Sequence, residues 1–339
     1  MNGHVHLVVP GLFLAHGMAA EPCGESDLRA LETVLARADA HALHAESLEA
    51  WLGEAFGTGD ALAPVTLAAD GGQPGAAYWL RADPAYLMLR GSDVILRPLV
   101  AVRADEAAQL CDTLNRHFAA EGLHFSAPHP QRWYLRLAQA PDIATHPLAR
   151  VAGRDIRDCL PHGPDALRWH RMLNEIQMLL HAHPVNDARE ARGEAPVNSV
   201  WLWGGGYGHE LAAPPFARVY ADSALAAAFA AAAHVSARPL AGLAAQGAVA
   251  GTGTTLVVWD GLGRAAGAGD VAAWCESLGA LERACMAPLL HALRQRTLER
   301  LTLDAVQEHG AWRYTLTPRT AWRFWRRRRR LGQYPAASR

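Results

Sequence analysis

The stretch Asn198–Gly206, NSVWLWGGG, opens the part of the sequence that decides the fold. Its residues Ser199–Trp203 predict a buried strand, and the three glycines after them predict a turn. From this point onward, short apolar runs alternate with helical segments, which is typical of a mostly parallel sheet with helices on both faces. The sequence therefore predicts an α/β fold.

The elements expected downstream keep this alternating order. Pro288 lacks the backbone N–H that a continuous helix needs, so we expect a break near it. The predicted strands are Ala217–Tyr220, Thr254–Trp259, Leu301–Asp304 and Trp312–Leu316, and the predicted helices are Ser223–Ala233, Val271–Arg296 and Pro318–Arg330.

Upstream of this region, His4–Val9 predicts a short buried strand that is stopped by a Pro-Gly turn. Helical spacing predicts helices at Asp27–Ala38 and Ser47–Phe56, with Ser47 as the candidate N-cap of the second. The Gly-, Pro- and Ala-rich stretch Asp60–Gly75 predicts a domain boundary. We expect residues 1–60 and 190–339 to form the core, and residues 61–189 to form an inserted or lid-like α+β region.

The composition of the chain excludes several kinds of chemistry. All 32 of the Lys+Arg positions are arginine, so the chain is lysine-free and can use neither Schiff-base nor Walker-type phosphate-loop chemistry. The formal net charge is −1, so no global field favours a nucleic-acid or membrane partner. A small phosphorylated or anionic ligand, if one binds, must be held by arginine, histidine, backbone N–H groups or a metal ion. Its five cysteines are widely spaced and include no C-x-x-C pair, so the sequence suggests neither a zinc site nor a disulfide framework, and we expect a cytoplasmic protein.

The densest polar chemistry lies in the stretch that leads into the opening strand. Asn186 and Arg189 are three residues apart, Asn198 immediately precedes the strand, and Gly204 follows it. Glycines at the carboxyl end of a strand let backbone N–H groups approach an anion closely. A tight turn with an Asn cap explains the same spacing equally well.

Arginines also suggest an anion-binding group earlier in the chain. Arg132 and Arg136 have even spacing on a predicted strand, so they face one side and could grip a phosphate or carboxylate. His129 lies close by in sequence, and His162 stands in a Pro-His-Gly-Pro loop. A solvated strand face is the alternative for the arginines, and a simple turn is the alternative for His162.

Carboxylates follow two of the predicted parallel strands. Asp260 and Asp304 stand at strand ends, where metal ligation and a cap or turn role are equally supported. For Asp270 the cap role is favoured.

Four segments together carry a resemblance to a known family. The chain resembles the archaeal-type cofactor-independent phosphoglycerate mutases of the alkaline-phosphatase superfamily, and most closely the regulatory proteins of the RpfE type. The segments are Trp133–Arg136, Leu160–Pro164, Asn186–Arg189 and Asn198–Gly206.

This resemblance implies phosphoryl transfer on a small phosphorylated acid, in a core that includes the N-terminal strand. It also implies a metal held by Asp260 and Asp304. On this basis, Arg264 would supply the positive charge that a lysine near the metal supplies in the family. The expected substrate-binding residues are Asn198, Arg189, Asn186, Arg132, His162, Gly204 and Arg264.

The chain departs from the family pattern at the metal ligands. Pro10 stands where the first strand of the family ends in a metal-binding Asp, no His follows Asp260, and Ala305 replaces the His after Asp304, with His309 displaced. Two-metal catalysis needs both ions. We therefore expect a phosphoester- or anion-binding regulatory relative with degenerate metal sites. The alternative is an active mutase or phosphatase that uses one or more divalent ions (Mn, Zn or Mg), and whether the chain is an enzyme stays open.

A basic run follows the last predicted strand. Trp322 and Trp325 have helical spacing, so we expect them to pack on the core, with Arg326–Arg330 as a solvated helix end. Contact of this run with nucleic acid or an anionic surface is the weaker alternative.

Overall fold

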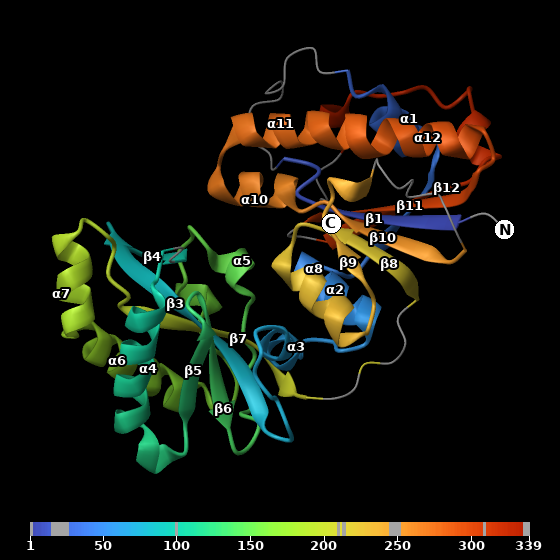
Figure 1. Cartoon of the computed structure of the whole chain (residues 1–339). Coiled ribbons are helices and arrows are strands. Elements are labelled where there is room, and N and C mark those ends of the chain that lie inside the picture. The colour runs from blue at the N-terminus through green and yellow to red at the C-terminus, as the bar shows by residue number, and fades with distance from the viewer. Residues whose placement is uncertain are drawn as a thin grey trace. The chain divides into compact units, whose positions relative to one another are not determined.

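The computed structural model describes residues 3–14, 27–98, 101–208, 211, 215–243, 252–307 and 310–334. The chain divides into two compact units (Figure 1). Unit 1 combines Met1–Gly57 with Leu211–Arg339, and unit 2 is Thr58–Glu210. Unit 2 thus runs to residue 210, and the inserted region that we expected covers residues 61–189.

Unit 1 is built on a seven-stranded sheet in the order β2-β12-β11-β1-β10-β8-β9. The strand β1 lies between β10 and β11 and is parallel to both, and β8 continues the parallel part beside β10. The mostly parallel sheet of the predicted α/β fold is thus confirmed. At one edge of the sheet, β12 pairs antiparallel with β11 and with β2. The strands are β1 (Gly3–Pro10), β2 (Asp39–Leu43), β8 (Phe216–Ala221), β9 (Ala237–Arg238), β10 (Thr254–Val258), β11 (Leu298–Gln307) and β12 (Gly310–Leu316).

Both faces of this sheet are covered by helices (Figure 1). The alternate residues Val5, Leu7 and Val9 of β1 are buried in one large apolar core, as the period of two along a strand requires. The helices that contribute to this core are α1 (Arg29–Arg37), α10 (Gly261–Ala268), α11 (Val271–Leu281) and α12 (Ala287–Arg294). On the other face, α2 (Leu48–Phe56) packs beside α8 (Ala224–Ala232), and Phe56 lies between Phe216 and Phe229.

Two of the predicted helix signals can be checked directly. The Ser47 side chain accepts a hydrogen bond from the N–H of Ala50 at 3.1 Å, so the predicted N-cap is confirmed. The predicted long helix breaks into α11 and α12 at a π-helical turn, Glu282–Met286, which lies just before Pro288. Pro288 donates no backbone hydrogen bond, which explains why the regular ladder changes here.

Unit 2 contains an antiparallel sheet in the order β4-β3-β6-β5, with β7 paired to β3. The expectation that Ser199–Trp203 belongs to the parallel core is therefore wrong. The strands are β3 (Tyr78–Arg90), β4 (Asp93–Pro98), β5 (His124–His129), β6 (Arg132–Leu137) and β7 (Ser199–Tyr207), and the helices are α3 (Leu62–Ala69), α4 (Ala104–His117), α5 (Leu148–Val151), α6 (Ala166–His181) and α7 (Pro184–Ala191).

The glycines at the end of β7 serve close packing. A Cβ atom added to Gly206 would lie 2.2 Å from the Cβ of Ala61, and one added to Gly205 would lie 2.3 Å from the hydroxyl of Tyr78. The distance to Ala61 is shorter than any real carbon contact, so only glycine at position 206 allows the start of α3 to approach β7 this closely.

The end of the described chain differs from the predicted helix Pro318–Arg330. Only Thr320–Trp322 forms a short 3-10 turn, and a second such turn follows at Leu331–Gln333. Trp322 is 58% exposed and Trp325 is 67% exposed, so the expectation that both pack on the core is wrong. Among the described residues, no helix has the length and apolar character needed to cross a bilayer.

The sequence suggested no disulfide framework, and in the structure Cys275 is disulfide-bonded. Cys111, Cys159 and Cys285 are free thiols.

Candidate functional site

Asp304 is the centre of a buried polar cluster in unit 1. The guanidinium of Arg313 donates to both of its carboxylate oxygens, from Nε at 2.8 Å and from Nη2 at 2.6 Å. Nε1 of Trp51 donates to Oδ2 at 2.7 Å, and Nε2 of His6 lies 2.8 Å from the same oxygen. We call these four residues the Asp304 cluster.

The sheet and one helix bring the cluster together. Asp304 on β11 is directly paired with Arg313 on β12, so both side chains lie on one face. His6 reaches Asp304 from the neighbouring strand β1, and Trp51 comes down from α2. The ring of His6 packs edge-on against Trp51 at 5.1 Å and against Phe216 at 6.0 Å. The carboxylate is therefore enclosed by aromatic rings and by a guanidinium.

The charge of Asp304 is stabilised in spite of its burial. The side chain is fully buried, and burial alone would raise its pKa. The hydrogen bonds and charges of Arg313 and His6 outweigh this effect and lower the pKa of Asp304 to about 2. Arg313 benefits in turn, because its bond to Asp304 raises the pKa of the guanidinium.

Asp260 lies in a different environment at the carboxyl end of β10. Its Oδ2 is 3.3 Å from Nη1 of Arg264, one turn further along α10. Its Oδ1 is buried without a hydrogen-bond partner. Burial raises the pKa of Asp260, Arg264 opposes this effect, and the charge of Asp222 after β8 adds to it. We call Asp260, Arg264 and Asp222 the Asp260 corner.

Three observations on the described residues concern metal binding near Asp304 and Pro10. Both oxygens of Asp304 already accept hydrogen bonds from cationic or N–H donors. At the end of β1, Gly11 packs so closely on α10 that an added Cβ would lie 2.8 Å from the Cα of Gly263, and its neighbour Pro10 offers no ligand atom in its side chain. Within the described ranges, no three His, Cys, Asp or Glu side chains are grouped so that they could hold a metal ion. His309 lies outside the described residues.

Asp270 has the structural role that its sequence position favours. Its Oδ1 accepts a hydrogen bond from the N–H of Ala273 at 2.9 Å, which caps α11.

Two asparagines of the predicted substrate set brace backbone segments in unit 2. Asn186 donates to the carbonyls of Leu180 and Val197, and its Oδ1 accepts from the N–H of Val197. Asn198 forms a two-way pair with the backbone of Leu87, at 2.7 and 2.8 Å. These contacts use the amide groups that we expected to meet a substrate.

The arginines of the predicted set are held in ion pairs. Arg189 is buried, donates from Nη1 to Glu106 at 2.6 Å, and also donates to the carbonyls of Ala195 and Ala101. Arg132 binds Asp70 through Nε and Nη2. These contacts join segments that are distant in sequence.

The remaining two residues of the predicted set lie in turns and sheet packing. His162 is exposed and its ring stacks on that of His146 at a centroid distance of 5.7 Å. Gly204 has φ +66°, and an added Cβ would lie 3.3 Å from the Cβ of Leu62, so its backbone follows the packing of α3. The structure brings Asp260 and Arg264 together, and it places Asp304 with residues outside the predicted set.

The partners of Asp304 lie outside the set of residues predicted from the sequence. His6 carries a signal, because it is a polar residue in alternation with the apolar Val5 and Leu7 of a buried strand. Arg313 and Trp51 carry no such signal, because their roles depend on a strand pairing and a helix position that are set by the tertiary fold.

Unit 2 also holds a buried charge pair whose two residues lie outside the predicted set. Arg81 and Asp83 on β3 form an ion pair at 2.6 Å, and both side chains are buried. The guanidinium of Arg81 lies 5.2 Å from the ring centres of both Tyr134 and Trp203. Nε1 of Trp203 also donates to Asp83 at 2.7 Å, so the pair is fixed within the sheet.

Comparisons with known proteins agree on one class of relative. The chain is similar to the 2,3-bisphosphoglycerate-independent phosphoglycerate mutase of Methanosarcina mazei, with 31% identity over 124 residues, which are 35% of this chain and 30% of that protein. It is also similar to a probable mutase of the same name from Geobacter sulfurreducens, with 37% identity over 62 residues, which are 18% of this chain and 16% of that protein. The matches thus span less than a third of these curated relatives. No family model matches the chain.

Similarity in structure extends further along the chain. The solved structure of PH0037 from Pyrococcus horikoshii aligns with 93% of this chain and 87% of its own, with a TM-score of 0.54 and 10% identity. At this identity the likeness concerns the fold alone. The chain is therefore similar in sequence to phosphoglycerate mutases over about a third of its length, and a solved structure shares its α/β fold.

Proposed function

We propose that this chain is a phosphoglycerate mutase-like protein that binds a phosphoester or a related small anion and does not carry out two-metal catalysis. It would then act as a regulatory relative of the mutases, as the resemblance to the RpfE type implies. The observation that carries the proposal is the Asp304 cluster, in which Arg313 occupies the carboxylate that the family resemblance assigns to a metal.

Electrostatics supports this reading of the cluster. A divalent cation at Asp304 would lie beside a guanidinium that donates to both oxygens, and like charges at this distance repel strongly in a buried site. The cation would also have to replace the bond from Trp51. The positive charge that a metal supplies in a two-metal site is thus supplied here by a side chain.

The Asp260 corner offers an anion-binding group. The Arg264 side chain is 65% exposed and stands in the first turns of α10, whose N-terminal N–H groups favour negative charge. Arginine can bind a phosphate through two parallel N–H bonds, but it cannot act as a proton donor at neutral pH. This chemistry favours binding over turnover.

An active phosphoryl-transfer enzyme is the second candidate. One observation favours it, namely the buried Oδ1 of Asp260, which has no hydrogen-bond partner. A single Mn²⁺, Zn²⁺ or Mg²⁺ ion would satisfy this oxygen and would supply Lewis-acid chemistry when bound.

A combined binding and activity experiment separates the two candidates. The full chain is dialysed against a chelator, and its thermal unfolding is followed with 3-phosphoglycerate at rising concentration. We expect the midpoint to rise by several degrees at saturation, and we expect Arg264→Gln to abolish the rise. Arg90→Gln, which removes an exposed arginine in unit 2, serves as the matched control and should leave the rise unchanged.

The same sample is then assayed for interconversion of 2- and 3-phosphoglycerate after addition of Mn²⁺, Zn²⁺ or Mg²⁺. The proposal expects no turnover above the protein-free blank. Metal-dependent turnover would establish the enzyme instead, and a midpoint that no phosphoester moves would remove the binding function.

A further inference from the structure

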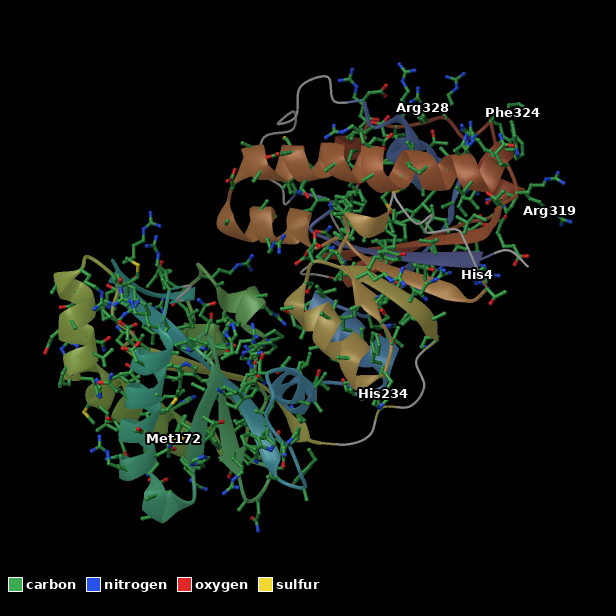
Figure 2. The ribbon with its side chains drawn as sticks, in the orientation of Figure 1. His4, Met172, His234, Arg319, Phe324 and Arg328 are labelled. Carbon is green, nitrogen blue, oxygen red and sulfur yellow. The ribbon has the colours of Figure 1, made fainter. Side chains whose placement is uncertain are left out.

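Aromatic and arginine side chains gather at the surface of unit 1 between Arg319 and Arg330. Phe324 is 79% exposed, and Trp322 and Trp325 are 58% and 67% exposed. The five residues Arg326–Arg330 that follow are all exposed as well. Figure 2 shows the side chains of Arg319, Phe324 and Arg328 on the outer surface of this unit. We call Trp322, Phe324, Trp325 and Arg326–Arg330 the aromatic–arginine patch.

The backbone under this patch is fixed to the body of the unit. Arg37 on α1 donates to the carbonyl of Ala321 at 2.5 Å, and Arg326 donates to the carbonyl of Ala38 at 2.7 Å. Arg323 forms an ion pair with Asp39. The rings are therefore held on the surface by an anchored segment, although a buried position would remove them from water.

The patch is strongly cationic although the chain as a whole has a net charge of −1. Seven arginines lie between Arg319 and Arg330, and no Asp or Glu occurs between Gly310 and Tyr334. Burial together with the nearby charges of Arg294 and Arg328 lowers the pKa of Arg37, so guanidinium groups from α1, α12 and the patch lie near one another. Such a local concentration of positive charge attracts a surface with many negative charges.

We propose that the aromatic–arginine patch binds an anionic phospholipid membrane surface from the side, without spanning it. The arginines would contact lipid phosphates, and Trp322, Phe324 and Trp325 would enter the boundary between head groups and acyl chains. Aromatic rings beside cationic side chains are suited to this boundary, and a cationic cluster is attracted to anionic lipids. Phe324 is the strongest single indication, because its ring has no polar group to satisfy in water.

The geometry of the rings favours a membrane over single-stranded nucleic acid. The rings of Phe324 and Trp325 lie 5.3 Å apart at an interplanar angle of 82°. Successive bases of a nucleic-acid strand stack on the faces of aromatic rings. Because the rings of Phe324 and Trp325 are nearly perpendicular, their faces do not point in one direction. Insertion between lipids needs exposed apolar area and no common ring plane. The expectation of no membrane partner rested on the net charge. The net charge is a sum over the whole chain, so it does not reveal a local concentration of arginines.

Vesicle flotation with the full chain tests the proposal. The vesicles consist of phosphatidylcholine alone or with about 30% phosphatidylserine, in a buffer of low ionic strength. We expect binding to the phosphatidylserine vesicles that is at least about tenfold stronger than binding to phosphatidylcholine alone, and that weakens as salt is added. Phe324→Ser with Trp325→Ser should weaken this binding at least about tenfold while the net charge stays the same.

Matched variants separate the two contributions. Arg327→Gln, Arg328→Gln and Arg329→Gln in one chain should remove both the binding and its salt dependence, while the same loss of charge at Arg90, Arg168 and Arg171 in unit 2 should not. Leu89→Ser, at an apolar residue of unit 2 that is 78% exposed, controls for the loss of an exposed apolar group. Circular dichroism melting of each variant checks that it is folded.

Three outcomes would overturn the proposal. These are no binding to phosphatidylserine vesicles, equal binding by the wild type and the Phe324→Ser, Trp325→Ser variant, and binding to a single-stranded oligonucleotide that is tighter than binding to the vesicles.

Discussion

Arg313 and Asp304 face each other across the antiparallel pair β11–β12, and the guanidinium of Arg313 holds both oxygens of the buried carboxylate at 2.8 and 2.6 Å. This arrangement gives the carboxylate a fixed positive partner that belongs to the chain itself. The contribution of this ion pair to the stability of the fold, and its dependence on pH, can therefore be measured without any ligand.

Removal of the arginine should be costly. Arg313→Ala leaves a fully buried carboxylate without its cationic partner, so we expect the free energy of unfolding to fall by about 3–5 kcal/mol in urea titrations at pH 7. Arg323→Ala is the matched control, because its partner Asp39 is mostly exposed and such pairs contribute less than about 1 kcal/mol.

A double-mutant cycle with Asp304→Ala isolates the pair itself. The double variant should be more stable than the sum of the single losses implies, because it leaves no unpaired charge. If Arg313→Ala cost no more than Arg323→Ala, the carboxylate of Asp304 would not depend on the guanidinium.

The pH dependence of stability should carry the signature of Asp304. Its pKa is about 2 in the folded chain, below the ordinary aspartate value of 3.8, so the folded state favours the charged form. The resulting stabilisation of about 2 kcal/mol is complete above about pH 4 and is lost as the pH falls towards 2. We expect the thermal unfolding midpoint of the wild type to decrease as the pH is lowered through this window. In the Asp304→Asn variant, the unfolding midpoint should decrease less over this pH range. If the midpoints of the two proteins changed in parallel with pH, Asp304 would not be the group responsible.

Asp260 should behave in the opposite way. Burial raises its pKa in the folded chain, so its charged form costs stability at pH values above the unfolded pKa. Asp260→Asn should therefore raise the free energy of unfolding at pH 7, by up to about 1 kcal/mol, and the gain should vanish in acid. Asp270→Asn is the control, because it keeps a good N-cap on α11 and should change little.

The same pair of proteins shows whether a cation binds at Asp260. A Mn²⁺ titration that stabilises the wild type but not Asp260→Asn would establish one metal ion at this carboxylate, and it would favour the enzyme over the metal-free binding protein. We expect no such difference.

The glycine end of β7 predicts a packing defect. Gly206→Ala would place its Cβ 2.2 Å from the Cβ of Ala61, so the start of α3 must move, and we expect a loss of about 1–3 kcal/mol. Gly267 lies in α10, and a Cβ added there would have open space around it. Gly267→Ala should therefore leave the free energy of unfolding unchanged or raise it slightly. Equal effects in urea unfolding would show that close approach is not the reason for the glycine.

Periodicity predicted the elements whose apolar pattern matches their burial. Alternating or continuous apolar runs located β1, β10 and β11, and helical spacing located α1 and α8. The same reasoning failed for β7, because an apolar strand followed by glycines has the same pattern in a parallel core and in an antiparallel sheet. The partner strand decides between them, and pairing with β3 is a long-range contact that local sequence does not encode.

The site residues show the same division. Asp260 and Arg264 are four apart at a predicted helix start, so their proximity could be read from the sequence. The pairing of Asp304 with Arg313 depends on the register of a hairpin, and the bond to Trp51 depends on where α2 packs. The helical spacing of Trp322 and Trp325 suggested burial, but the segment does not form a helix long enough to turn both rings inward.

The position of β1 in the sheet has a consequence for synthesis of the chain. Its two neighbours are far away in sequence, with Val8 paired to Val258 on one side and to Asp304 on the other. At about 5–20 residues per second, this apolar strand waits roughly 15–60 seconds on the ribosome before both neighbours exist. Unit 2 is contiguous and is complete much earlier. The nascent chain therefore passes through a state with one finished unit and an unpaired strand, which is the interval in which chaperones would matter most.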